Sequence, residues 1–251
     1  MMIRQQIDKA IVQKRFESSL NSYNSNARPQ SQIIEHFWHL LKQQCFFSET
    51  KNVLEIGCGT GMLSQKLLTL PKLETLHVND LVENSFVCDN EKIQTCWGDA
   101  ETALLPNELD LVASASTFQW FEDLDSFFLK ISRHLRAQGM FCFTTFGPKN
   151  FQEIRKLTGK GLHYPTISEI RQLLGRHFDL IHSSETVMSN FFKHPKHVLR
   201  HIRNTGVNGT AESKWTPGKL KHFCQTYENL FLTNQGVSLT FHPYFFIAKK
   251  K

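Results

Sequence analysis

Three glycines follow a short apolar run in VLEIGCGTG, residues 53–61. Glycine allows tight turns and close approach of a ligand, and a helix that starts after them presents free N–H groups. The spacing is GxGxG, and Met62 stands where the GxGxxG of a dinucleotide site would have its last glycine. Glu55, two residues before Gly57, would repel a pyrophosphate but suits a ligand with a positive charge. The segment therefore predicts a small-molecule binding loop that is not of the dinucleotide type.

Alternating apolar runs and helical patterns must position this loop. Predicted strands lie at 52–57, 75–80, 92–99, 109–115 and 139–147, with predicted helices at 62–70 and 123–135 between some of them. Such alternation indicates an α/β fold with a mostly parallel sheet covered by helices on both faces. FDLIHSSETVM (178–188) and VSLTFHPYFFIAKK (237–250) are predicted to be late strands that complete the sheet.

Helices are predicted on either side of this core. Residues 5–23 and 31–44 have helical spacing, with Ser31 as the expected cap of the second helix. A capping box, Thr166 to Glu169, precedes a helix. A basic helix follows near 197–205 and is expected to end at Gly206, and Thr216-Pro217 opens another helix. We expect one domain over 1–251, with lid helices at 1–45, a ligand-binding core at 46–150 and a helical cap at about 188–235.

The glycine segment resembles motif I of the class I S-adenosylmethionine (SAM) methyltransferases. This resemblance implies a Rossmann-like, seven-stranded fold and SAM as methyl donor. Asp80, at the end of the second strand, then accepts the ribose hydroxyls, and Asp99 accepts the adenine amine. Considered alone, each aspartate also suits a turn or helix cap. The full set expected to bind the cofactor is Glu55, Gly57, Gly59, Gly61, Asp80, Leu81, Asp99, Ala100, Ser114 and Ala115.

Several further segments resemble one family within that class. SASTFQWFEDLDSFF, TTFGPKNFQEIR, HYPTISEIRQLL and LRHIRNTGVNG are similar to segments of the malonyl-acyl-carrier-protein O-methyltransferases of biotin synthesis. KRFESSLNSYNSNA resembles the opening RFxxAAxxYxxxA of that family, with Tyr23 at its tyrosine, although Ser18, Ser19 and Leu20 replace the alanine-rich stretch. The resemblance covers nearly the whole chain and implies methylation of the free carboxylate of a malonyl thioester.

The implied reaction needs little acid–base chemistry. A carboxylate is already ionised at neutral pH, so we assign no general base. Transfer depends instead on alignment in a dry site, for which Tyr23, Gln119 and Trp120 are candidates as positioning and lid residues. Phe146, Arg155, Arg200 and Arg203 are candidates for contact with the substrate, because a guanidinium can hold a carboxylate. Each arginine could equally be a solvated surface residue.

The basic helix raises other possibilities. His194, His197 and His201 lie on one helical face, but the surrounding lysines and arginines would repel a metal ion, so we expect no metal. Aromatic residues are not interleaved with these cations, which argues against nucleic acid. The formal charge of +6 favours an acidic partner, and we expect malonyl-acyl carrier protein to dock on the cap.

Composition places the chain in a broad class. Hydrophobic residues make up 40% and charged residues 21%, as in ordinary globular proteins. No signal peptide or membrane span is predicted, and the six cysteines show no CxxC pair, which favours a reduced, cytoplasmic protein. Open alternatives are another small acid or a quinone-type ring as acceptor, coenzyme A in place of the carrier, and a SAM-binding partner or regulatory protein without turnover.

Overall fold

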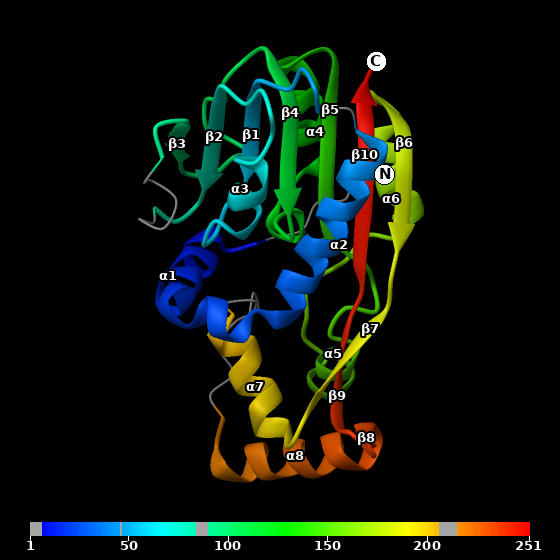
Figure 1. Ribbon diagram of the computed structural model, residues 1–251. Coiled ribbons are helices and arrows are strands. Elements are labelled where there is room, and N and C mark those ends of the chain that lie inside the picture. The colour runs from blue at the N-terminus through cyan, green and yellow to red at the C-terminus, as the bar shows by residue number, and fades with distance from the viewer. Residues whose placement is uncertain (1–6, 46, 84–89, 206–214) are drawn as a thin grey trace.

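A seven-stranded sheet forms the body of the protein. The computed structural model describes residues 7–45, 47–83, 90–205 and 215–251. The strand order is β3-β2-β1-β4-β5-β10-β6, in which only β10 runs against its neighbours. The strands are β1 (Asn52–Ile56), β2 (Thr75–Asp80), β3 (Ile93–Trp97), β4 (Leu109–Ala115), β5 (Leu135–Phe146), β6 (Phe178–Glu185) and β10 (Pro243–Lys250). This confirms the predicted Rossmann-like α/β fold (Figure 1).

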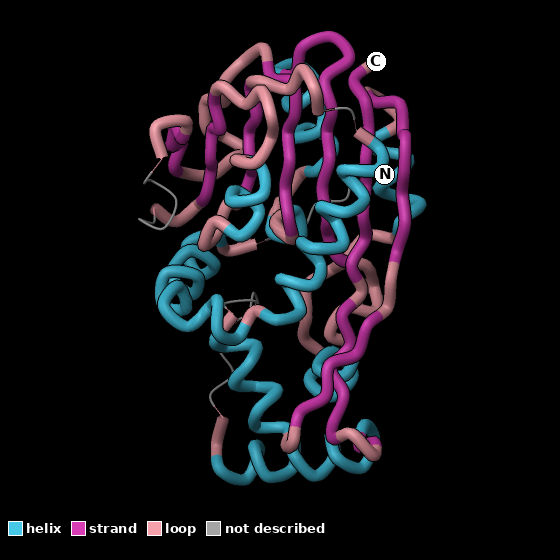
Figure 2. The backbone as a smooth tube through the Cα atoms, viewed as in Figure 1, coloured by secondary structure: helices cyan, strands magenta, loops and turns pink. Residues whose placement is uncertain are grey.

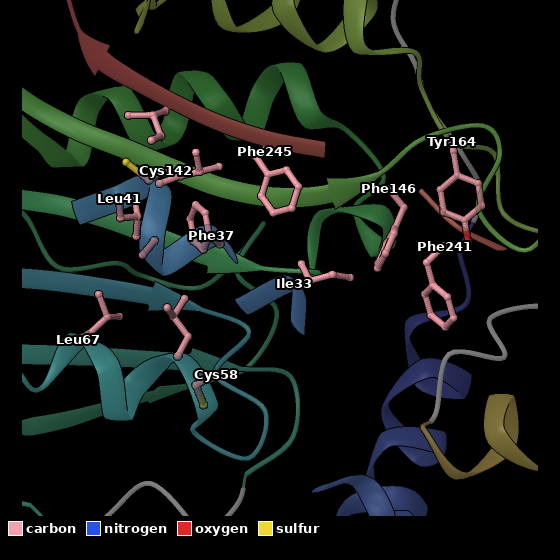
Figure 3. Close-up of a cluster of buried hydrophobic side chains, with 14 of the residues drawn as sticks. Ile33, Phe37, Leu41, Cys58, Leu67, Cys142, Phe146, Tyr164, Phe241 and Phe245 are labelled. Carbon is pink, nitrogen blue, oxygen red and sulfur yellow. The ribbon is translucent and has the colours of Figure 1, made fainter. Parts of the chain in front are cut away.

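Helices cover both faces because successive strand residues point to opposite sides. On one side Val53, Leu111 and Phe245 pack with α2 (Arg28–Gln44) and α3 (Met62–Leu67), as Figure 3 shows for Ile33, Phe37 and Leu67. On the other side their neighbours in sequence pack against further helices and a dense cluster of phenylalanines. The helices on this side are η2 (Phe118–Trp120), α4 (Leu124–His134) and α6 (Ile167–Leu174), and α6 opens with the predicted capping box.

The amino-terminal helices differ slightly from the prediction. α1 (Lys9–Asn26) is capped by Asp8, whose carboxylate accepts from Ile11 N at 3.1 Å. α2 begins at Arg28 rather than after Ser31, because Pro29 fits the first turn and Ser31 N already donates to Ala27 O at 2.9 Å. The two helices meet at a bend above the cap (Figure 1).

The cap contains a small sheet that the sequence analysis did not predict. Beside α7 (Pro195–Asn204) and α8 (Pro217–Phe231) lie β7 (Met188–Phe192), β8 (Leu232–Thr233) and β9 (Gly236–Phe241), in the order β7-β9-β8. The single closing strand expected at 237–250 divides at His242, whose N–H donates to Asn150 Oδ1 at 3.3 Å, before Pro243, which has no N–H to continue the ladder. Figure 2 shows strands running from the large sheet into the small one.

Candidate functional site

The glycine segment forms the predicted turn between β1 and α3. Gly57, Gly59 and Gly61 all have positive φ, at 72°, 53° and 82°. A Cβ on Gly57 would lie 2.0 Å from Thr117 Oγ1, so no larger residue fits there. A Cβ on Gly59 would meet no atom within 4 Å, so this residue borders open space. The loop thus leaves its backbone accessible to a ligand at the carboxyl end of the sheet.

A cavity opens over this loop and is closed from above by α1. The core lines it with Ile56, Gly57, Gly59, Thr60, Asn79, Asp80, Leu81, Val82, Gly98, Asp99, Ala100, Ala115, Ser116, Thr117, Trp120 and Phe121. Helix α1 contributes Lys9, Val12, Phe16, Ser19, Leu20 and Tyr23. The structure therefore brings together predicted residues from the ends of four strands, β1 to β4, and adds a helical lid with a mostly apolar inner face.

Asp80 occupies the end of β2 beside the glycine loop. Its carboxylate accepts from Gly59 N at 2.8 Å and from Val82 N at 3.0 Å. Burial raises the pKa of Asp80, and hydrogen bonds from the backbone of Val82, Gly59 and Leu81 oppose that shift. The carboxylate is fixed by the loop and still lines the cavity, where it can accept hydroxyl groups of a ligand.

Lys9 is a site residue that the sequence analysis missed. Its ammonium donates to Asp99 Oδ2 at 2.6 Å and also to Glu101. Burial lowers the pKa of Lys9, but its hydrogen bonds to the two carboxylates together raise it above the ordinary value. Glu101 additionally accepts from the N–H groups of Glu122 and Asp123, at 3.1 and 2.9 Å. The lid is thus tied to the predicted adenine end of the cavity; no motif marks Lys9, because only the fold brings α1 there.

Three predicted cofactor residues support the cavity without lining it. Glu55 is buried and accepts from Ser64 Oγ of α3, and burial raises its pKa to about 8. Ser114 Oγ donates to Ile56 O at 2.8 Å, which joins β4 to the start of the glycine loop. Gly61 caps α3 in a left-handed conformation. Their contacts shape the loop from behind.

The predicted lid residues lie at the cavity with one exception. Tyr23 lines it, and burial together with the charge of Asp80 raises the pKa of its phenol to about 12. Trp120 lines it as well and meets Phe16 of α1 edge to face, with ring centroids 5.8 Å apart. Its indole Nε1 is buried and has no hydrogen-bond partner among the described residues. Gln119 is buried beside the cavity, where its amide donates to Ser116 O.

The predicted substrate residues are not brought together at the cavity. Phe146 is buried in the core where β5 ends. Arg155, on α5 (Gln152–Thr158), donates to the carbonyl oxygens of Pro148 and Asn150, so its guanidinium is engaged with a turn. Arg200 and Arg203 are exposed on α7. Arg200 lines a separate groove between lid and cap, beyond the cavity.

The three histidines of the basic helix have separate surroundings. His194 caps α7, because its Nδ1 accepts from Lys196 N at 3.0 Å, and its Nε2 lies 3.7 Å from Glu228 Oε1. His201 is buried, and burial lowers its pKa to about 4. Among the described residues no group of three or more potential ligands could hold a metal ion. No helix of the described chain is long and apolar enough to span a membrane. Gly206, the expected end of the basic helix, lies outside the described residues.

The fold and the glycine-loop cavity define a class I SAM-dependent methyltransferase, and residues 54–143 match the methyltransferase domain family. A methyltransferase described as putative, from Bacillus halodurans, superposes with a TM-score of 0.64 at 16% identity, over 85% of this chain and 98% of that one. A phosphoethanolamine N-methyltransferase from Haemonchus contortus, solved with SAM, gives a TM-score of 0.53 at 16% identity over 86% and 52%. These likenesses concern the fold.

Relatives with much higher identity fix the family. A malonyl-[acyl-carrier protein] O-methyltransferase from Bacteroides thetaiotaomicron is 39% identical over 98% of this chain and 99% of its own length. One from Bacteroides fragilis is 42% identical over 97% of this chain, which spans 51% of that relative. The chain belongs to the malonyl-[acyl-carrier protein] O-methyltransferase family.

Proposed function

We propose that the protein transfers a methyl group from SAM to the free carboxylate of a malonyl thioester carried by acyl carrier protein. The product is a methyl ester that can prime pimeloyl synthesis for biotin. The observation that carries the proposal is the lidded glycine-loop cavity in a chain whose near full-length relatives bear this name. Free thiols at the described cysteines accord with a cytoplasmic location.

The cavity suits SAM in shape and in donor set. Open space beside Gly59 gives the cofactor a close approach to the backbone, and Gly57 and Ala115 line the same cavity. Asp80 would accept the ribose hydroxyls, while Asp99 and the adjoining Ala100 and Leu81 would surround the adenine. When bound, SAM supplies an activated methyl group.

The residues around the cavity would orient the acceptor and exclude water. The carboxylate of the malonyl group supplies the electron pair of the new O–CH₃ bond, the S–CH₃ bond of the donor breaks, and its electron pair leaves on the sulfur of S-adenosylhomocysteine. No proton must be removed first. Tyr23 and the unpartnered indole N–H of Trp120 are suitable donors to that carboxylate. Neutral donors hold it without forming an ion pair that would weaken its nucleophilicity. Of the predicted substrate residues, Arg200 and Arg203 are exposed and can serve the substrate outside the cavity, along its arm or at its carrier.

The basic cap is the proposed docking surface for the carrier. Exposed cations on and beside α7 and α8 are Lys193, Lys196, Arg200, Arg203, Lys219 and Lys221. An acidic carrier would be steered to them, so its Michaelis constant should rise several-fold between low salt and about 0.5 M salt. A Michaelis constant that stays constant over this range would exclude mainly electrostatic docking.

The function is tested by incubation with SAM and alternative acceptors. Malonyl-carrier protein should acquire one methyl group, malonyl-coenzyme A less efficiently, and free malonate or a quinone ring hardly at all. Equal turnover of free and carrier-bound acids would favour another small-acid methyltransferase. SAM binding without turnover of any acceptor would instead point to a binding or regulatory protein.

A further inference from the structure

A second hollow lies between the lid and the cap, and none of its residues lines the glycine-loop cavity. We call it the lid–cap groove. It is lined by Ser25, Asn26, Arg28, Pro29 and Gln32 at the bend of α1 and α2, by Ser189, Asn190, Phe191 and Phe192 of β7, and by His197, Arg200 and His201 of α7. In Figure 1 this bend lies above α7. The lining contains two guanidiniums and no carboxylate.

The two arginines are available to a ligand. Arg28 and Arg200 are both exposed, and neither forms an ion pair with another described residue. Arg136 and Arg176, by contrast, are paired with Asp110 and Asp125. Two guanidiniums that form no ion pair with a described residue thus line one hollow. Together they favour an oxyanion that both can bind, because each presents a fork of N–H donors.

The helix start at Arg28 adds to this preference. α2 has 17 residues, and no side chain caps its first turn. Pro29 has no N–H and Ala27 N donates to Tyr23 O of α1, so the N–H groups of Arg28 and Gln30 are the ones in this turn that can meet an anion. The amide of Asn190 and the hydroxyl of Ser189 line the same groove and can complete the hydrogen bonds of an oxyanion.

A buried polar group at the groove also lacks a partner. His201 is only 7% exposed, lies near the rings of Phe192 and Phe241, and lines the groove. Its Nε2 has no hydrogen-bond partner among the described residues. Buried polar atoms are normally paired, so an unpaired one at a hollow indicates a site that a ligand or water completes.

One helix, α1, lines both the cavity and the groove. Tyr23 of α1 lines the cavity, and Asn26, roughly 4.5 Å further along that helix, lines the groove. An anion in the groove is therefore a different part of the substrate from the carboxylate that accepts the methyl group. A carrier protein presents its thioester on a pantetheine arm, which is attached through a phosphate.

We infer that the lid–cap groove binds the phosphate of this arm, through Arg28 and Arg200, while the malonyl end enters the cavity. The inference rests on the proposed function. It predicts that the enzyme distinguishes substrates by the phosphate of the arm, in addition to the acidic surface of the carrier.

The test compares substrates with and without that phosphate. Malonyl-phosphopantetheine and malonyl-pantetheine share the thioester and differ only in the phosphate. Wild-type kcat/KM should be more than tenfold higher for the first, because two charge-assisted contacts are proposed and each contributes about tenfold. Arg28→Ala should raise KM for malonyl-phosphopantetheine about tenfold with little change in kcat, and the double variant Arg28→Ala/Arg200→Ala should remove the preference. Lys42→Ala is a matched control, because it removes an exposed cation from the last turn of the same helix, about 21 Å away.

The outcomes distinguish the phosphate assignment of the groove from the proposed methyl transfer. If Arg28→Ala lowers kcat/KM equally for both substrates, or for neither, the phosphate assignment is wrong. Titration calorimetry with phosphopantetheine, pantetheine and inorganic phosphate tests the groove without turnover. Tight binding of phosphopantetheine alone, weakened about tenfold in Arg28→Ala, supports the arm site even if no methyl transfer occurs. Equal binding of inorganic phosphate would overturn it in favour of a general phosphate site.

Discussion

Replacing Asp80 with alanine removes the carboxylate that we assign to the ribose. This carboxylate accepts from Gly59 N at 2.8 Å and Val82 N at 3.0 Å. Loss of these bonds costs stability, but burial also raises the pKa of Asp80, so the removed charge was itself unfavourable. The two effects oppose each other, and the free energy of unfolding should fall by only about 1 kcal/mol.

The effect on ligand binding should be much larger. Two hydroxyl bonds to a carboxylate contribute about 3 kcal/mol together, so Kd for S-adenosylhomocysteine should rise roughly 100-fold. At a concentration of 100 times the wild-type Kd, the ligand stabilises the wild type by about 2.7 kcal/mol and the variant by about 0.4 kcal/mol.

Titration calorimetry measures the change in Kd, and thermal unfolding with and without ligand checks it independently. Asp179→Ala, at an exposed position on β6, is the control for loss of a negative charge. An Asp80→Ala protein that folds normally and binds within threefold of the wild type would refute the ribose assignment.

Further variants test the lid and the buried acid. Lys9→Met should speed proteolysis of α1 in the cofactor-free protein two- to fivefold, because a partly exposed ion pair contributes about 0.5–1 kcal/mol; unchanged rates would show that the pair does not hold the lid. Glu55 has a folded pKa of about 8, above the 4.5 of an ordinary glutamate, so wild-type stability should decrease as pH rises through this window, by about 5 kcal/mol at most. The free energy of unfolding of Glu55→Gln, measured at pH 5 and pH 8, should lack this contribution. An identical change in the free energy of unfolding between the two pH values in both proteins would contradict the raised pKa of Glu55. Tyr23→Phe and Trp120→Phe should each lower kcat about tenfold and leave Kd for S-adenosylhomocysteine within threefold; a loss confined to cofactor binding would remove them as acceptor donors.

Local patterns were sufficient to predict the sheet and the cofactor end of the site. Strand periodicity and the three glycines depend on nearby residues, so the turn at 57–61 and the position of Asp80 at the end of β2 follow directly. The division of the last strand at His242 depends on contacts with Asn150 and Glu185, which are distant in the chain. The small cap sheet was missed for the same reason, because β7 pairs with β9 and both cap helices lie between these two strands in the sequence.

The acceptor end of the site was predicted less well. An arginine side chain can bind a carboxylate, and this chemistry alone led to the predicted substrate contacts. The fold shows that Arg155 donates to carbonyl groups of a turn and that Arg200 lines a separate groove. Lys9 of α1 donates to Asp99, which lies 90 positions away in the sequence. The spacing of residues within α1 does not indicate such a distant partner. Residue type indicates possible chemistry, whereas the partner depends on long-range packing.

The most direct measurement is mass spectrometry of malonyl-acyl carrier protein after incubation with SAM and the enzyme. The account predicts that the malonyl group gains a single methyl group, located by fragmentation on its free carboxylate, and that S-adenosylhomocysteine forms in equal amount. Asp80→Ala should lose this activity at SAM concentrations near the wild-type KM. Recovery of only unmodified malonyl thioester from a folded enzyme that binds SAM would contradict the account.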